Sequence, residues 1–101
     1  MTINTVNIIG GKGAMGRFFH HRLQSRGIET QSLDKPLNRQ DLARNLSGTD
    51  LVLLAVPIQA MQEVLDVLSP VLEPRTILAD ICSVKVKPLS MMLAAHQGPI
   101  V

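Results

Sequence analysis

The stretch of sequence that decides the fold is residues 6–16, which read Val6-Asn7-Ile8-Ile9-Gly10-Gly11-Lys12-Gly13-Ala14-Met15-Gly16. The apolar residues at its start predict a short buried strand. The glycines that follow have the spacing G-x-G-x-x-G, with Gly11, Gly13 and Gly16 in the three glycine positions. A glycine cluster of this spacing between a strand and a helix is typical of the loop that holds the pyrophosphate of a dinucleotide.

Each glycine of the loop is expected to have a separate task. Gly11 permits the tight turn off the strand, Gly13 lets a pyrophosphate approach the backbone, and Gly16 lets the helix pack on the strand. The amides near Ala14 and Met15 then point at the phosphates, with the positive end of the helix dipole behind them. The alternative is an ordinary glycine-rich turn, which would need neither the strand before it nor the helix after it.

Length and composition limit the class of protein. A chain of 101 residues predicts one domain, and its 46% hydrophobic content includes no apolar run long enough for a membrane span. The start shows no signal peptide, so we expect a cytoplasmic protein with no membrane partner. The net charge of +2 and the presence of only two aromatic residues, Phe18 and Phe19, argue against a nucleic-acid partner. Cys82 is the sole cysteine, which excludes an intrachain disulfide.

The glycine loop opens into a helical pattern over residues 14–26. Met15, Phe19 and Leu23 recur at four-residue spacing, which predicts one apolar stripe facing the sheet. Gly27 follows the last periodic residue and is expected to end the helix.

The histidines give no metal site. His20 and His21 are adjacent on this helix and cannot face one point as an i, i+4 pair would, so both are expected to be solvated. His96, near the end of the last predicted helix, is expected to be a surface group that complements the helix dipole. All three are expected to lie away from the carboxyl edge of the sheet.

Asp34 is the predicted ribose ligand. It ends an imperfectly alternating strand pattern over residues 28–33 that suits a sheet edge, and it lies 18 positions after Gly16. An acidic residue roughly 20 positions after the loop accepts hydrogen bonds from the adenosine ribose, which favours NAD over NADP. Lys35 and Arg39 are close enough in sequence to weaken that preference. The alternative is a turn residue ahead of the following proline.

The rest of the chain predicts further alternating elements. Residues 51–56 are apolar throughout, as a central parallel strand requires. The other elements expected are a helix over 38–46, a helix opened by Pro57 with Met61, Val64, Leu65 and Leu68 inward, a strand over 76–80, and a helix opened by Pro88 and stopped by Gly98-Pro99. In that last helix Leu89, Met92 and Leu93 are expected to face inward. Ile100-Val101 begins a fifth strand.

The alternation predicts an α/β fold, a Rossmann-like doubly wound parallel sheet with strand order 2-1-3-4. The switch point then lies between the first and third strands, where ligands bind at the carboxyl ends. Three segments reach that edge: residues 11–16, Val56-Pro57 and residues 80–85.

At this point the chain resembles a known family, the prephenate dehydrogenases of tyrosine biosynthesis, over residues 6–101. The motifs that carry the resemblance are Gly10-Gly11-Lys12-Gly13-Ala14-Met15-Gly16, Leu54-Ala55-Val56-Pro57 and Asp80-Ile81-Cys82-Ser83-Val84-Lys85. The last is the most specific, because many NAD enzymes share the other two. The resemblance implies that Val56 and Pro57 contact NAD and that Ser83 is a catalytic serine near the nicotinamide and the substrate.

The resemblance also implies groups that these 101 residues lack. In the family, hydride leaves the carbon that bears the ring hydroxyl of prephenate or arogenate, while a histidine removes the hydroxyl proton and CO₂ is lost. That histidine lies in a Gly-x-His-Pro turn, which is not in this sequence. A helical domain supplies the substrate-binding arginine and the homodimer interface. We therefore expect residues 1–101 to be a dinucleotide-binding domain that binds NAD without turnover.

Alternatives stay open at this stage. Ser83 could be a helix cap and Lys85 a solvated side chain. A non-catalytic NAD sensor would carry the same loop and Asp34, and so would a dehydrogenase of 3-hydroxy acids or imino acids. Ser83-Val84-Lys85 is the segment that favours the prephenate dehydrogenase interpretation over both.

Overall fold

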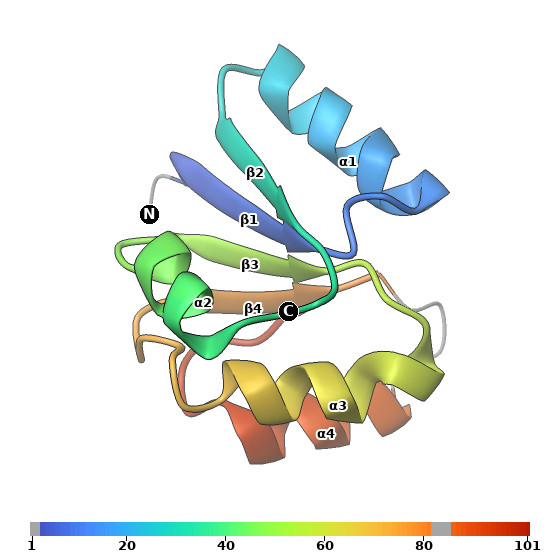
Figure 1. The fold of residues 1–101 in the computed structure, drawn as a ribbon, viewed down its shortest axis with the longest axis vertical. Coiled ribbons are helices and arrows are strands. Elements are labelled where there is room, and N and C mark those ends of the chain that lie inside the picture. Colours follow the sequence, from blue (N-terminus) through green and yellow to red (C-terminus); the bar gives the residue numbers. More distant parts are fainter. Residues whose placement is uncertain (1–2, 82–85) are drawn as a thin grey trace.

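The computed structural model describes residues 3–81 and 86–101, and within them four strands alternate with four helices. Their order is β1 (Thr5–Ile9), α1 (Ala14–Ser25), β2 (Glu29–Leu33), α2 (Arg39–Leu46), β3 (Leu51–Leu54), α3 (Ile58–Leu68), β4 (Ile77–Asp80) and α4 (Val86–Ala95). All four arrows point the same way, toward the right of Figure 1. None of these helices is long and apolar enough to cross a membrane.

The sheet is parallel with the order β2-β1-β3-β4, which confirms the predicted Rossmann-like topology. Its register aligns the carboxyl ends of the strands. Ile9 of β1 pairs with Leu33 on one side and Leu54 on the other, and Leu54 pairs with Asp80. The residues that follow these four therefore start at one edge of the sheet, at the switch point between β1 and β3.

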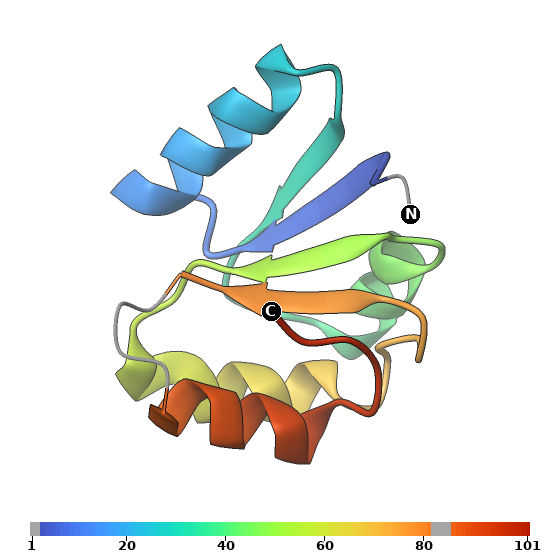
Figure 2. The same cartoon turned by 180° about the vertical axis from the view of Figure 1, so that it is seen from behind.

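The helices cover the two faces of the sheet unequally. Among the described helices, α1 alone packs on one face, and α2, α3 and α4 pack on the other (Figures 1 and 2). The core under α2–α4 is the larger one and takes the predicted inward residues of α3, namely Met61, Val64, Leu65 and Leu68. The smaller core under α1 centres on Val6, Ile8, Leu53 and Ala79.

Two predictions about inward-facing leucines are wrong. Leu89 and Leu93 of α4 are 43% and 61% exposed, because this helix packs with Pro88 and Met92 inward. The prediction for Met92, which is 1% exposed, is confirmed. The helix also begins at Val86, two residues before the proline that was expected to open it. On α1, Met15 is 52% exposed, so the predicted stripe reduces to Phe19 and Leu23, both half-buried.

The prediction for His96 is also wrong. Its side chain is 6% exposed, and its Nε2 donates to the carbonyl oxygen of Thr76, 2.7 Å away, just before β4. Burial of an imidazole costs less when its N–H has such a partner. His96 therefore lies under the amino end of β4, away from the carboxyl edge as expected.

The chain after α4 returns along the outer side of β4. Leu78 donates to the carbonyl of Pro99 at 2.9 Å and accepts from the amide of Val101 at 2.8 Å, which gives a single parallel bridge to Ile100. A complete fifth strand stays a prediction.

Candidate dinucleotide-binding site

The turn off β1 belongs to Gly10, not to Gly11 as predicted. Gly10 has φ +89°, a conformation that residues with a side chain rarely adopt, and its amide donates to the carbonyl of Leu33 at 2.9 Å. A Cβ here would lie 2.6 Å from the Ala55 carbonyl oxygen and 2.9 Å from Cγ1 of Val56. The start of the loop is therefore held between β2 and the end of β3, and Val56 lies beside it.

Gly13 and Gly16 differ in what surrounds them. A Cβ on Gly16 would lie 2.7 Å from Cα of Gly11 and would also overlap the Gly10 carbonyl oxygen, so close packing of helix on loop requires this glycine. A Cβ on Gly13 would meet nothing nearer than 3.7 Å. The fold therefore leaves open space at Gly13, on the outer side of the loop.

The first turn of α1 has no negative group to satisfy it. Gly13 is the N-cap, no side chain caps the helix, and its first turn contains no acidic residue. The helix begins with the amide of Arg17 bonded to the Gly13 carbonyl at 2.9 Å. The amides of Ala14 and Met15 therefore belong to the free end of a helix dipole, where an anion is favoured.

Asp34, the predicted ribose ligand, lies beside the loop and holds it. Its Oδ1 accepts a hydrogen bond from the amide of Lys12 at 3.1 Å, across 22 positions of sequence. The side chain is half-buried at the carboxyl end of β2. A carboxylate at the end of the second strand is in the place where ribose hydroxyls bind in this class of site.

A hollow of about 480 Å³ lies beside Asp34 and the loop. Its lining residues are Gly11, Lys12, Arg17, His20, His21, Gln24, Ser32 and Asp34. Lys12 and Arg17 line this hollow together with Asp34, and Lys35 and Arg39 are not among its lining residues. Lys35 instead forms an ion pair with Glu63 of α3, at 3.1 Å.

His20 is not the solvated, remote side chain that the sequence predicts. It is half-buried, and its Nδ1 lies 2.5 Å from Oγ of Ser32, one residue before the end of β2. His21 is exposed, in agreement with the prediction. The sequence does hold a signal for this contact. Ser32 is a polar residue on the face of the edge strand β2 that α1 covers, so it needs a polar partner from that helix.

The remaining predicted site residues lie on the same edge or outside the described residues. Val56 is half-buried, and Pro57 is exposed as the N-cap of α3. Asp80 is 9% exposed at the end of β4. Ser83, the predicted catalytic residue, lies outside the described residues together with its neighbours Cys82, Val84 and Lys85.

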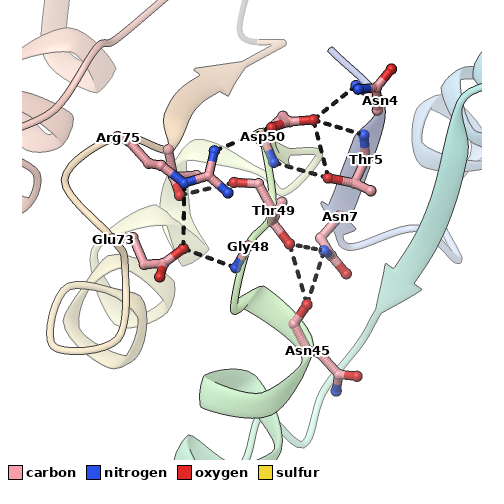
Figure 3. A network of polar contacts seen from close by, with 10 residues as sticks. Asn4, Thr5, Asn7, Asn45, Gly48, Thr49, Asp50, Glu73 and Arg75 are labelled. Atoms are coloured by element: carbon pink, nitrogen blue, oxygen red, sulfur yellow. Dashed lines mark hydrogen bonds and ion pairs between the residues drawn. The ribbon is translucent and has the colours of Figure 1, made fainter. Parts of the chain in front are cut away.

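A second polar cluster occupies the opposite, amino edge of the sheet (Figure 3). Asp50 accepts from the amides of Asn4 at 2.8 Å and Thr5 at 3.1 Å, and Nη1 of Arg75 donates to it at 3.2 Å. The Asn4 amide first, and then the Arg75 guanidinium, hold the pKa of the Asp50 carboxyl below its ordinary value. The carboxylate thus ties β3 to the start of β1.

Asn7 continues this cluster into the interior. Its Nδ2 donates to Oγ1 of Thr49 at 2.7 Å and to the carbonyl of Asn45 at 3.3 Å, and the residue is 4% exposed. Within the described residues its Oδ1 has no partner. Sequence reasoning missed this cluster, because Asn7 sits inside an apolar strand pattern and its partners are more than 35 positions away.

Comparison with known families decides between the interpretations that the geometry allows. Residues 20–99 match the model of the nucleotide-binding domain of prephenate dehydrogenase. The chain belongs to this family. The match confirms the resemblance to this family, and the matched residues include the Ser-Val-Lys segment and begin after the glycine loop.

Two related proteins align with nearly the whole chain. This chain is 41% identical over 98 residues to the T-protein of Enterobacter agglomerans and 36% identical over 101 residues to that of Haemophilus influenzae. Each alignment covers 97% of this chain and 26% of the relative. The chain thus spans about a quarter of the length of these relatives.

A solved structure shows the same fold. The prephenate dehydrogenase of A. aeolicus, crystallised with hydroxyphenyl propionate and NAD⁺, matches with a TM-score of 0.67 at 20% identity. The match covers 92% of this chain and 38% of that one.

Proposed function

We propose that this chain binds NAD at the carboxyl edge of its sheet. The observation that carries the proposal is the pairing of an uncapped α1 with a loop that leaves open space at Gly13. A pyrophosphate placed there would accept hydrogen bonds from the free amides and meet the positive end of the helix dipole. Asp34, half-buried and bonded to the same loop, supports ribose binding next to it.

The residues present fit the cofactor and favour NAD over NADP. A carboxylate about 4 Å from a 2′-phosphate costs on the order of 4 kcal/mol per unit charge pair before screening. Lys12 and Arg17 line the same hollow and reduce that cost, so we expect a preference and not an absolute exclusion. Val56 and Pro57 are proposed to contact the cofactor, because Val56 lies against the turn at Gly10.

We further infer that the chain is the cofactor half of an enzyme that oxidatively decarboxylates prephenate or arogenate. Bound NAD supplies a hydride acceptor, and this chain orients it. Neither buried His96 nor His20, which is bonded to Ser32, is placed as a free base at the centre of the carboxyl edge. A missing general base removes about 10²- to 10⁴-fold in rate. The role of Ser83, a homodimeric enzyme and a cytoplasmic location are further proposals, supported by the family resemblance.

One set of titrations tests the function. NADH and NADPH are titrated into the 101-residue chain and followed by nucleotide fluorescence, and NAD with prephenate is then followed by absorbance. We expect saturable binding, tighter for NADH, and no turnover above background. Absence of NADH binding by a folded chain would contradict the proposed site. Turnover at the rate of an ordinary enzyme would place the base within these residues.

A further inference from the structure

Residues 32–34, at the end of β2, hold the glycine loop at three successive positions. Two of the contacts are the hydrogen bonds to the loop amides described above. The third is steric, because the Ser32 side chain occupies the space that a Cβ on Gly11 would need. Both Cβ and Oγ of Ser32 occupy that space, so Gly11 packs against this side chain and the direction of the hydroxyl sets part of the contact.

His20 determines where Ser32 points. A serine hydroxyl can occupy three staggered rotamers, and the contact of 2.5 Å between Nδ1 of His20 and Oγ of Ser32 favours one of them. His20 belongs to α1, the helix whose first turn carries the free amides. One imidazole thus connects the helix, the end of β2 and the glycine loop.

We propose that His20 is a positioning residue for dinucleotide binding, which acts through Ser32 on the backbone of Gly11. The proposal rests on the proposed function only in naming the dinucleotide as the ligand. A loop that is already in its binding shape loses less conformational freedom when the ligand arrives. Removal of the imidazole should therefore weaken binding even though the phosphate-binding amides remain.

The electrostatic surroundings of His20 must be kept separate from this effect. Lys12, Arg17, His21 and Asp34 line the same hollow, so a charge on His20 would also change the attraction for phosphate. His20→Gln separates the two effects, because a glutamine side chain carries no charge and can still bond to Ser32. Ser25→Ala is the matched control, because Ser25 is an exposed residue of the same helix and does not line the hollow.

The decisive experiment is a double-mutant cycle on the affinity for NADH. His20→Ala and Ser32→Ala should each weaken binding about fivefold, the effect of losing one hydrogen bond. The double variant should be no weaker than either single one, because both remove the same contact. His20→Gln, which can still bond to Ser32, should recover most of the affinity, and Ser25→Ala should bind normally. Multiplicative losses would show that His20 contacts the ligand directly, and unchanged affinity in His20→Ala would overturn the proposal.

A second readout needs no ligand. In the free chain, His20→Ala should increase the rate of hydrogen exchange at the amides of Gly11 and Lys12, with the amide of Asp50 at the opposite edge as an internal reference. Unchanged exchange at the loop would contradict the positioning role. If the wild-type chain failed to bind NADH while this exchange effect was present, the proposed function would be wrong and the positioning of the loop would stand.

Discussion

The two edges of the sheet differ in how their polar groups are satisfied. At the amino edge, Asp50 and Arg75 satisfy each other and the adjacent backbone amides. At the carboxyl edge, the glycine loop is held from behind by Asp34, while the first turn of α1 has neither a cap nor an acidic residue. Polar groups thus gather at both edges, and among the described residues the uncapped start of α1 lies at the carboxyl edge.

This difference distinguishes polar residues that stabilise the fold from polar groups that bind a ligand. The polar cluster at the amino edge stabilises the fold, since its bonded groups lose their partners if the fold opens, while Oδ1 of Asn7 has no partner among the described residues. Free amides at a helix start do not stabilise the fold in this way, because their hydrogen bonds form only when an anion binds. Substitutions at the amino edge should therefore affect stability, and those at the carboxyl edge should affect binding.

The largest effect is expected at Asn7. In Asn7→Asp, a carboxylate would replace the amide that donates to Thr49 and Asn45, inside the sheet. An unpaired buried charge should cost more than about 3 kcal/mol of the free energy of unfolding, measured by urea denaturation. Thr49→Val, which removes one hydroxyl and no volume, should cost about 1 kcal/mol as a control. A stable Asn7→Asp protein with impaired NADH binding would reverse the assignment of the two edges.

Gly13→Val should show the opposite pattern. The added side chain enters the open space at the loop, so NADH affinity should fall about a hundredfold, roughly 2.8 kcal/mol. The urea midpoint should change little, since a Cβ at Gly13 meets nothing nearer than 3.7 Å. Gly16→Val is the matched control and should lower the urea midpoint, because its Cβ has no space. Wild-type affinity in a folded Gly13→Val protein would remove this loop from the site.

The smallest effect is expected at Asp50, where the contribution of the amino edge to stability should depend on pH. Because the pKa of Asp50 is lowered in the folded chain, its carboxylate contributes stability above about pH 4, and this contribution is lost as the pH falls through the folded-state pKa. Asp50→Asn should thus lower the Tm at pH 7, and its difference from wild type should shrink toward pH 3. Asp66→Asn, on the exposed side of α3, provides the control. An equal Tm difference at both pH values would show that the carboxylate charge contributes nothing.

The sequence predicts what depends on periodicity and spacing. The strand order follows from alternating elements and short connections, and the position of Asp34 follows from its distance to the glycine loop. The same reasoning assigns Met61 and its neighbours on α3 to the core correctly. These features need only local pattern and the geometry of parallel sheets.

What the sequence misses depends on which face a helix turns inward and on contacts between distant segments. Leu89 and Leu93 look like core residues until α4 is seen to pack through Met92. His96 and His20 look like surface residues because their partners, Thr76 and Ser32, are 20 and 12 positions away. Hydrogen bonds of this kind leave no periodic signal in the sequence.

The unequal coverage of the sheet has a consequence for how the chain fluctuates. Gly16 is the buried residue of α1, and Phe18 on the same helix is 54% exposed, whereas the opposite face holds the larger core. A helix with so little buried area should open locally at a lower free energy than the rest of the fold. A ligand at its first turn binds only the closed form, so it suppresses those openings by mass action. Bound cofactor would therefore complete the anchoring of α1. Local opening would then become rarer along the whole helix, as far as Ser25 at its other end.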